Sequence, residues 1–137
     1  MDNYNNLILM LKDKTTGFFD QTIGSYEINK NMEYVDKIYA AEDEDDINIY
    51  LTLTTEEIEE DWKYSGIFNL YNEELFDDKV SEWEELSGDY NPKWVLKIKY
   101  SEDAKLIENL LNEILELHVN EIQRIIPLIN PEDYTEE

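Results

Sequence analysis

The sequence predicts an α+β domain built on an antiparallel sheet of about six strands, with a long C-terminal amphipathic helix packed on one face. Three observations predict this fold: short apolar runs separated by polar turns, an alternating segment at residues 46–54, and helical spacing of apolar residues from 104 to 126. The predicted element order is β-β-β-β-α-β-β-α. The length of 137 residues suits a single domain, which we assign to residues 1–130, with an acidic, flexible tail at 131–137.

The first four strands are predicted from apolar runs and from the turn residues between them. They cover residues 7–11, 18–28, 33–41 and 46–54. Within the second strand, Gly24 indicates a bulge or a close backbone approach. In the fourth strand, Ile47, Ile49, Leu51 and Leu53 alternate with more polar residues, which is typical of a strand with one buried face.

The fifth predicted element is a helix that begins at Thr54. The segment T-T-E-E, from Thr54 to Glu57, fits a capping box, and the acids that follow suit the first turns of a helix. We expect this helix to continue to about residue 72, with Gly66 as a weak point, although residues 63–76 also fit an alternating strand.

Two further strands are predicted, at residues 79–88 and 93–100. The second has the clearer pattern, because Lys93, Lys97 and Lys99 alternate with apolar residues. We expect these lysines to form an outer face balanced by neighbouring acids rather than a nucleic-acid site.

The last predicted element is the long helix. Ser101 is placed as its cap, apolar residues recur three and four apart from Ala104 to Ile126, and Pro127 ends it. His118 falls at the edge of the apolar stripe, where we expect a boundary residue with one nitrogen hydrogen-bonded.

The composition excludes several kinds of chemistry. Acidic residues outnumber basic ones 34 to 11, for a net charge of −23, so we expect no nucleic-acid and no membrane partner. Without cysteine there are no disulfides, thiol nucleophiles or thiolate metal sites. The start of the chain lacks a secretory pattern, and no apolar run approaches the roughly 18–20 residues that span a bilayer. We therefore expect a cytoplasmic protein.

The segment EDEDD places five acids, Glu42 to Asp46, between two predicted strands, at a hairpin tip. An EF-hand loop started at Asp43 fails at its fifth, sixth and twelfth positions. Asp43, Asp45 and Asp46 are the candidates for a looser cation site, and the other interpretation is a solvated turn.

Catalytic patterns are lacking. With one histidine, the chain cannot form the usual zinc or di-iron ligand sets, and no phosphate-binding glycine loop occurs. Ser25 lacks the second glycine of a nucleophile elbow. We therefore predict no enzyme activity, no catalytic residue and no cofactor.

Acidic residues concentrate between residues 42 and 89, where 18 of them face only Lys63 and Lys79. We expect a non-catalytic module, of an adaptor, chaperone, inhibitor or DNA-mimic type, that presents an acidic, aromatic surface to a basic protein. The predicted contact residues are Glu42, Asp43, Glu44, Asp45, Asp46, Glu56, Glu57, Glu60, Asp61, Tyr64, Tyr71 and Trp83. The alternative is a divalent-cation-dependent regulator or a small enzyme that uses surface carboxylates. A monomer and a homodimer both fit the sequence.

Four stretches together resemble a family of small acidic bacterial proteins grouped as a domain of unknown function. They are KDKTTGFFDQTIGSYEI (12–28), EIEEDWKYSGIFNLYNEELF (57–76), YNPKW (90–94) and LELHVNEI (115–122). The resemblance covers most of the chain and rests on aromatic and turn residues. It implies a single cytoplasmic domain and no activity, cofactor or site.

Overall fold

The computed structural model describes residues 6–72, 74–86 and 91–133. Within these ranges the chain forms six strands, two α-helices and three 3-10 turns. The strands are β1 (Asn6–Lys12), β2 (Phe19–Glu27), β3 (Val35–Asp43), β4 (Asp46–Leu53), β5 (Glu82–Leu86) and β6 (Lys93–Lys99). The helices are α1 (Asp61–Leu70) and α2 (Ala104–Ile125), and the 3-10 turns are η2 (Met32–Tyr34), η3 (Ile126–Leu128) and η4 (Pro131–Asp133). The α+β class and the chain order of these strands and helices are therefore as predicted.

The sheet is mixed rather than antiparallel, which corrects the sequence-based prediction. Its strands lie in the order β2-β1-β3-β4-β6-β5, and β1 runs parallel to β3, with Leu11 opposite Ala40. The other neighbours are antiparallel. Chain connectivity explains the difference: β3 does not pair with β2 but lies on the far side of β1, and so runs in the direction of β1.

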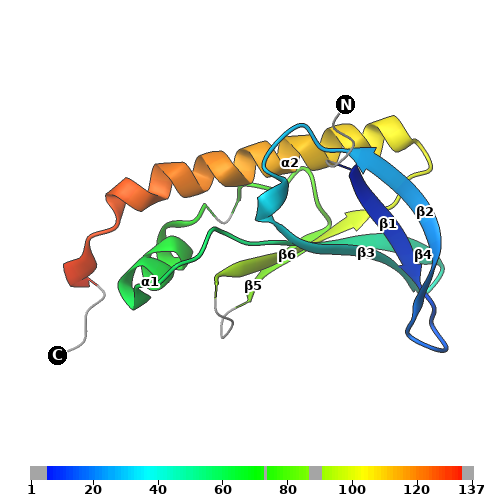
Figure 1. Cartoon of the computed structure of the whole chain (residues 1–137), viewed down its shortest axis with the longest axis horizontal. Helices are drawn as coiled ribbons and strands as arrows, with labels where there is room; N and C mark the ends of the chain where they lie inside the picture. Colours follow the sequence, from blue (N-terminus) through cyan, green and yellow to red (C-terminus); the bar gives the residue numbers. More distant parts are fainter. Residues whose placement is uncertain (1–5, 73, 87–90, 134–137) are drawn as a thin grey trace.

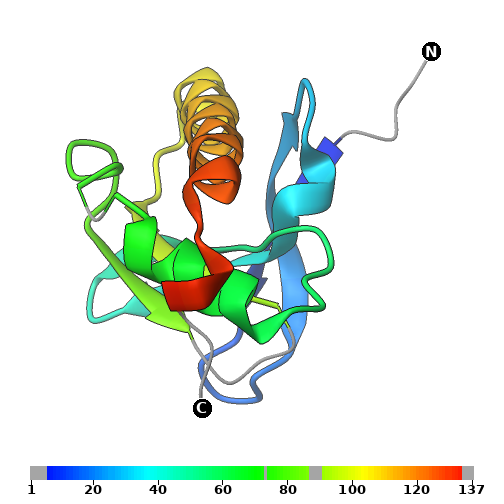
Figure 2. The same cartoon turned by 90° about the vertical axis from the view of Figure 1, so that its left-hand side faces the viewer.

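One face of the sheet forms the core with α2. Ile49, Leu51, Leu96 and Ile98 point to this face and are at most 1% exposed. The helix runs along the sheet (Figure 1), and the strands curve beneath it to both sides (Figure 2). It contributes a buried apolar stripe made of Ile107, Leu111, Ile114, Leu115, Val119, Ile122 and Ile125. The long helix therefore covers one sheet face, as predicted.

The opposite side of the sheet, away from α2, is called the open face below. The register of the strands assigns side chains to it from all six strands. They include Ile8, Met10 and Lys12 on β1, Phe19 on β2, Lys37 and Tyr39 on β3, Tyr50 on β4, Lys93, Val95, Lys97 and Lys99 on β6, and Glu82 and Glu84 on β5.

The predicted capping box does not start a helix, because its threonines have other partners. Thr54 Oγ1 donates to the carbonyl of Pro92 (3.0 Å), and Thr55 Oγ1 donates to the carbonyl of Glu56 (2.8 Å). Neither hydroxyl caps a helix, and α1 begins only at Asp61. The ambiguous segment at 63–76 is helical up to Leu70, and none of its described residues forms a strand.

The remaining elements differ from the predictions mainly at their ends. β5 spans only Glu82–Leu86 of the predicted strand at 79–88, whose last two residues lie outside the described part of the chain. Asp103, rather than Ser101, caps α2, because Asp103 Oδ1 accepts from the Leu106 N–H at 3.3 Å. The predicted tail begins with η4, which contacts α1. No helix among the described residues has the length and apolar character needed to cross a membrane.

Gly24 combines both features that the sequence indicated. It pairs with Leu9, and the register of β1 with β2 shifts directly after that pair. A Cβ atom at Gly24 would overlap the ring of Tyr26, which is 1% exposed. The glycine therefore leaves room for a buried tyrosine beside a bulge.

Gly24→Ala is expected to lower the free energy of unfolding by about 1–3 kcal/mol, because the added methyl group overpacks the core. Urea denaturation measures the change. The double variant with Tyr26→Leu, which removes the clashing ring, should lose less than the sum of the two single variants. Strictly additive losses would show that the ring is not the cause.

Candidate functional site

A hollow with acidic edges lies between the segment after β4, the start of α1 and the end of α2. It has a volume of about 190 Å³ and is called the acidic hollow below. Its lining residues are Tyr34, Thr55, Glu56, Glu57, Ile58, Lys63, Ile122 and Ile126. Small-molecule pockets usually measure about 300–1,000 Å³, so this hollow suits one side chain of a partner better than a whole ligand.

The fold explains how apolar and acidic groups meet in the acidic hollow. Ile122 and Ile126 come from the last turn of α2 and from η3, where the apolar stripe of the helix runs past the end of the sheet. Tyr34 comes from η2, which connects β2 to β3. Because the capping box fails, residues 55–60 form neither helix nor strand, and this irregular segment brings Ile58 and several acids beside the end of α2.

The acids around the hollow create a negative environment. Glu33, Glu56, Glu57, Glu59, Glu60 and Asp61 are all exposed. The pKa of Tyr34 is raised, first by burial and then by the carboxylates of Glu56 and Glu33. Lys63 lies 3.8 Å from Glu60 and offsets only part of this charge. The predicted contact residues Glu56, Glu57, Glu60 and Asp61 are therefore brought together at one place.

The acidic hairpin tip lies at the other end of β4. β3 ends at Asp43 and β4 begins at Asp46, so the predicted tip is confirmed, and all five acids there are exposed. Eight residues of β4 separate this tip from Thr54, a span of about 25 Å at the rise of a strand. The acids at 42–46 and at 56–61 thus form two separate groups rather than one continuous surface.

The hairpin tip is partly neutralised by lysines from neighbouring strands and turns. Lys97 Nζ donates to Asp43 Oδ2 at 3.3 Å, and Lys14 lies 3.9 Å from Glu42. Among the residues that the structure describes, no three histidine or acidic side chains are grouped to hold a metal ion. Asp43, Asp45 and Asp46 are therefore not assembled as a cation site.

The aromatic residues predicted as anchors for a partner point inward instead. Tyr71 is only 3% exposed and stacks on Trp94, with ring centroids 4.6 Å apart. Trp83 is half-buried against Tyr71, and Tyr64 is half-buried against Phe68. These contacts hold the three rings against the core, so Tyr71 offers almost no surface to a partner, and Trp83 and Tyr64 offer only part of theirs.

His118 is a core residue with both nitrogens engaged, which corrects its placement at the edge of the helix stripe. Its Nε2 lies 2.8 Å from the Thr54 carbonyl, and its Nδ1 lies 2.7 Å from the Tyr71 hydroxyl. A carbonyl can only accept, so Nε2 carries the proton and Nδ1 accepts from Tyr71. Burial lowers the pKa of His118 to about 4. The ring is therefore neutral, and it joins α2 to the residues that directly follow β4 and α1.

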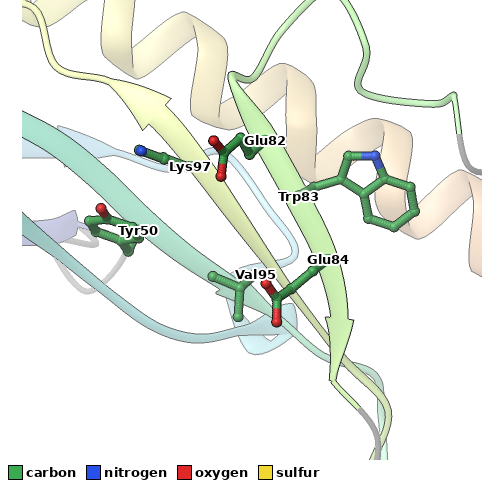
Figure 3. A pocket seen from close by; sticks show the side chains of 6 residues that line it. All are labelled: Tyr50, Glu82, Trp83, Glu84, Val95 and Lys97. Atoms are coloured by element: carbon green, nitrogen blue, oxygen red, sulfur yellow. The ribbon is translucent and has the colours of Figure 1, made fainter.

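A smaller hollow of about 90 Å³ lies on the open face. Its lining residues are Tyr50, Glu82, Trp83, Glu84, Val95 and Lys97 (Figure 3). Trp83 points away from the other five side chains (Figure 3). Lys97 pairs with Asp43, and Lys93 lies 3.4 Å from Asp36. Two of the three lysines on β6 are thus balanced by acids, as the sequence indicated.

The acids of the candidate site could be read from the sequence, but its apolar part could not. Ile122 belongs to the predicted helix stripe, which gave no sign that its end lies beside the acids. Nothing in the sequence places Tyr34 there, because its position depends on where η2 meets α2.

Comparisons with known proteins identify a family but no function. A family model described as "Family of unknown function (DUF6762)" matches residues 1–135. No curated protein and no solved structure matches the chain.

Proposed function

The chain belongs to this family of unknown function, and we propose that it is a non-catalytic, acidic protein-interaction module that binds a basic partner. The observation that carries the proposal is the acidic hollow, in which an apolar floor lies directly beside exposed carboxylates. Acidic residues that only keep a protein soluble do not require an apolar hollow beside them.

The hollow suits both the aliphatic stem and the charged head of an arginine or lysine side chain. The long aliphatic stem of such a side chain packs on apolar surface while its charged head stays at the rim. Ile58, Ile122 and Ile126 supply the apolar surface, and Glu56 and Glu57 supply carboxylates at the rim. A carboxylate binds a guanidinium through short, charge-assisted hydrogen bonds.

The remaining charge supports the same role at longer range. A net charge of −23 attracts a basic protein and speeds its encounter, while it repels nucleic acid and other acidic molecules. The only histidine, His118, is buried and engaged at both nitrogens, which makes it unsuitable as a general base at the surface.

A fluorescent arginine-rich peptide is expected to bind the protein, whereas the same peptide with glutamine in place of arginine should not. Glu56→Gln with Glu57→Gln should weaken binding about tenfold, because charge-assisted contacts are lost. Fluorescence anisotropy at low and high salt measures the affinity, which should fall as salt rises.

The matched control is Glu44→Gln with Asp45→Asn at the hairpin tip. This double variant also removes two negative charges, but at a site about 25 Å away. It should weaken binding about twofold at most, since only the long-range field changes. Equal losses for both double variants would mean that the peptide senses net charge alone, and the acidic hollow would then not be the site.

A further inference from the structure

The residues that follow α2 fold back onto α1, and this contact adjoins the acidic hollow. Residues 126–133, called the C-terminal segment below, contain η3 and η4, and both turns pack against α1 (Figure 2). Ile126, at the start of this segment, lines the hollow, and so does Lys63 in the first turn of α1. The helix and the segment thus touch each other and also supply two walls of the hollow.

The helix and the segment approach each other closely at Gly66 and Ile129. Ile129 is 7% exposed, and a Cβ atom on Gly66 would lie 2.5 Å from its Cγ2 and 2.9 Å from its Cγ1. Both distances fall well inside the roughly 3.5–4.0 Å at which carbon atoms pack. Because isoleucine is branched at Cβ and stiff about χ1, its side chain cannot simply turn away from an added methyl group. The glycine therefore allows the segment to dock at this distance.

The spacing of the residues connects this contact to the hollow. Lys63 and Gly66 are three residues apart on α1 and are neighbours on one side of that helix. Ile126 and Ile129 are also three apart, and the Ile129 N–H donates to the Ile126 carbonyl at 3.3 Å. In a 3-10 turn, side chains with this spacing lie one above the other. The contact of Gly66 with Ile129 thus lies one turn away from the residues that line the hollow.

The other end of α1 is held by separate bonds. Arg124 Nη2 donates to the Leu70 carbonyl at 3.2 Å, and the Asn72 N–H donates to Glu121 Oε2 at 2.8 Å. These bonds fasten the C-terminal end of α1 to α2. A displacement at Gly66 is therefore transmitted to the first turn of α1 and to η3, the two elements beside the hollow.

We propose that the contact of Gly66 with Ile129 sets the width of the acidic hollow, so that docking of the C-terminal segment on α1 controls binding of the basic partner. This inference rests on the proposed function and adds its regulation. In the docked segment, Ile126 forms part of the apolar floor for the stem of an arginine or lysine. When the segment moves away from α1, the floor loses this residue and binding weakens. The coupling is reciprocal, so a bound partner also holds the segment in place.

Gly66→Ala should weaken binding of the fluorescent arginine-rich peptide about fivefold, because the added methyl group pushes the segment away from α1. Alanine favours a helix more than glycine does, so α1 itself is kept. Fluorescence anisotropy over a salt series measures the effect. Since no charge changes, the salt dependence should match that of the unchanged protein, whereas Glu56→Gln with Glu57→Gln should reduce it.

Gly24→Ala is the matched control for this variant. It also overpacks a buried side chain without changing the charge, and β2 supplies none of the residues that line the hollow. It should leave the affinity for the peptide unchanged. Thermal melting should show that both variants are folded at the temperature of the binding measurement.

A double variant tests the contact itself. Ile129→Ala removes the atoms that an alanine at position 66 would overlap. The loss of affinity in Gly66→Ala with Ile129→Ala should therefore be smaller than the product of the two single losses. Independent losses would show that the two residues do not act on the hollow through each other.

Hydrogen exchange measures the coupling in the reverse direction. The peptide should slow amide exchange in fragments that contain residues 126–129 of the unchanged protein. Without the peptide, Gly66→Ala should speed exchange in the same fragments.

The outcomes separate this inference from the proposed function. An unchanged protein that does not bind the peptide would remove the proposed function, and the inference with it. If the unchanged protein binds, equal affinity in Gly66→Ala would overturn the inference alone. An equal loss in Gly24→Ala, or exchange at residues 126–129 that the peptide does not alter, would do the same.

Discussion

Trp94→Ala is expected to lower the free energy of unfolding by about 3–5 kcal/mol, out of a total of about 5–15 kcal/mol for a typical domain. Trp94 is fully buried on β6. Its ring lies 4.6 Å from that of Tyr71, 4.9 Å from that of His118 and 5.4 Å from that of Phe68. One side chain therefore joins the sheet to both helices, and its loss leaves a cavity that no single element can fill.

Trp94→Phe provides the control for this prediction. Among the described residues, the indole Nε1 is the buried side-chain nitrogen or oxygen without a hydrogen-bond partner. Phenylalanine removes this unsatisfied donor and keeps most of the aromatic contact, so the variant should cost much less than alanine. Urea denaturation measures both losses. An alanine variant that loses less than about 1 kcal/mol would show that the two helices do not depend on this contact.

The elements with the clearest local pattern were predicted well because their signal is contained within the segment. The alternating segment at 46–54 forms β4, and the apolar spacing from 104 to 126 forms α2. The predictions that proved wrong depended on contacts between segments distant in the sequence. Thr54 has a good capping sequence, but Pro92 offers its hydroxyl a carbonyl partner. Likewise, alternation shows which face of β3 is buried and cannot show that β3 pairs with β1.

The same distinction between local pattern and distant contacts applies to the candidate site. Its carboxylates were predicted because charge is visible residue by residue. Their separation into two groups was not, since it depends on the length and direction of β4. Tyr71 has the sequence context of a surface aromatic, among acids, yet the stacked Trp94 and the partner His118 hold it inside. Aromatic residues beside charges are ambiguous until their partners are known.

His118 is expected to make stability fall as the pH is lowered from 7 to 4. Its pKa is about 4 in the folded protein and near 6.5 in the unfolded chain. Between these values the unfolded chain binds a proton that the folded protein does not, so the free energy of unfolding decreases as the pH falls. The pKa difference corresponds to about 3 kcal/mol, present in full above pH 6.5 and lost by pH 4.

The groups that face His118 account for this direction. The Tyr71 hydroxyl keeps its proton, because burial, followed by the charges of Glu121 and Glu85, raises its pKa. The Thr54 carbonyl favours a protonated ring and Glu121 does so as well, but both are weaker than burial. Glu121 is already engaged by Arg124 and by the Asn72 N–H. The rings of Tyr34 and Trp94 add no charge.

His118→Gln isolates the effect, because the glutamine amide can donate to Thr54 and accept from Tyr71 without titrating. Acidification also relieves repulsion among the many carboxylates, but that change is common to both proteins and cancels in their difference. Urea denaturation at pH 7, 5.5 and 4 should therefore show the unchanged protein losing about 3 kcal/mol more than the variant. Parallel stability curves would mean that His118 titrates equally in the folded and unfolded chain, and is therefore not buried against Tyr71 and Thr54.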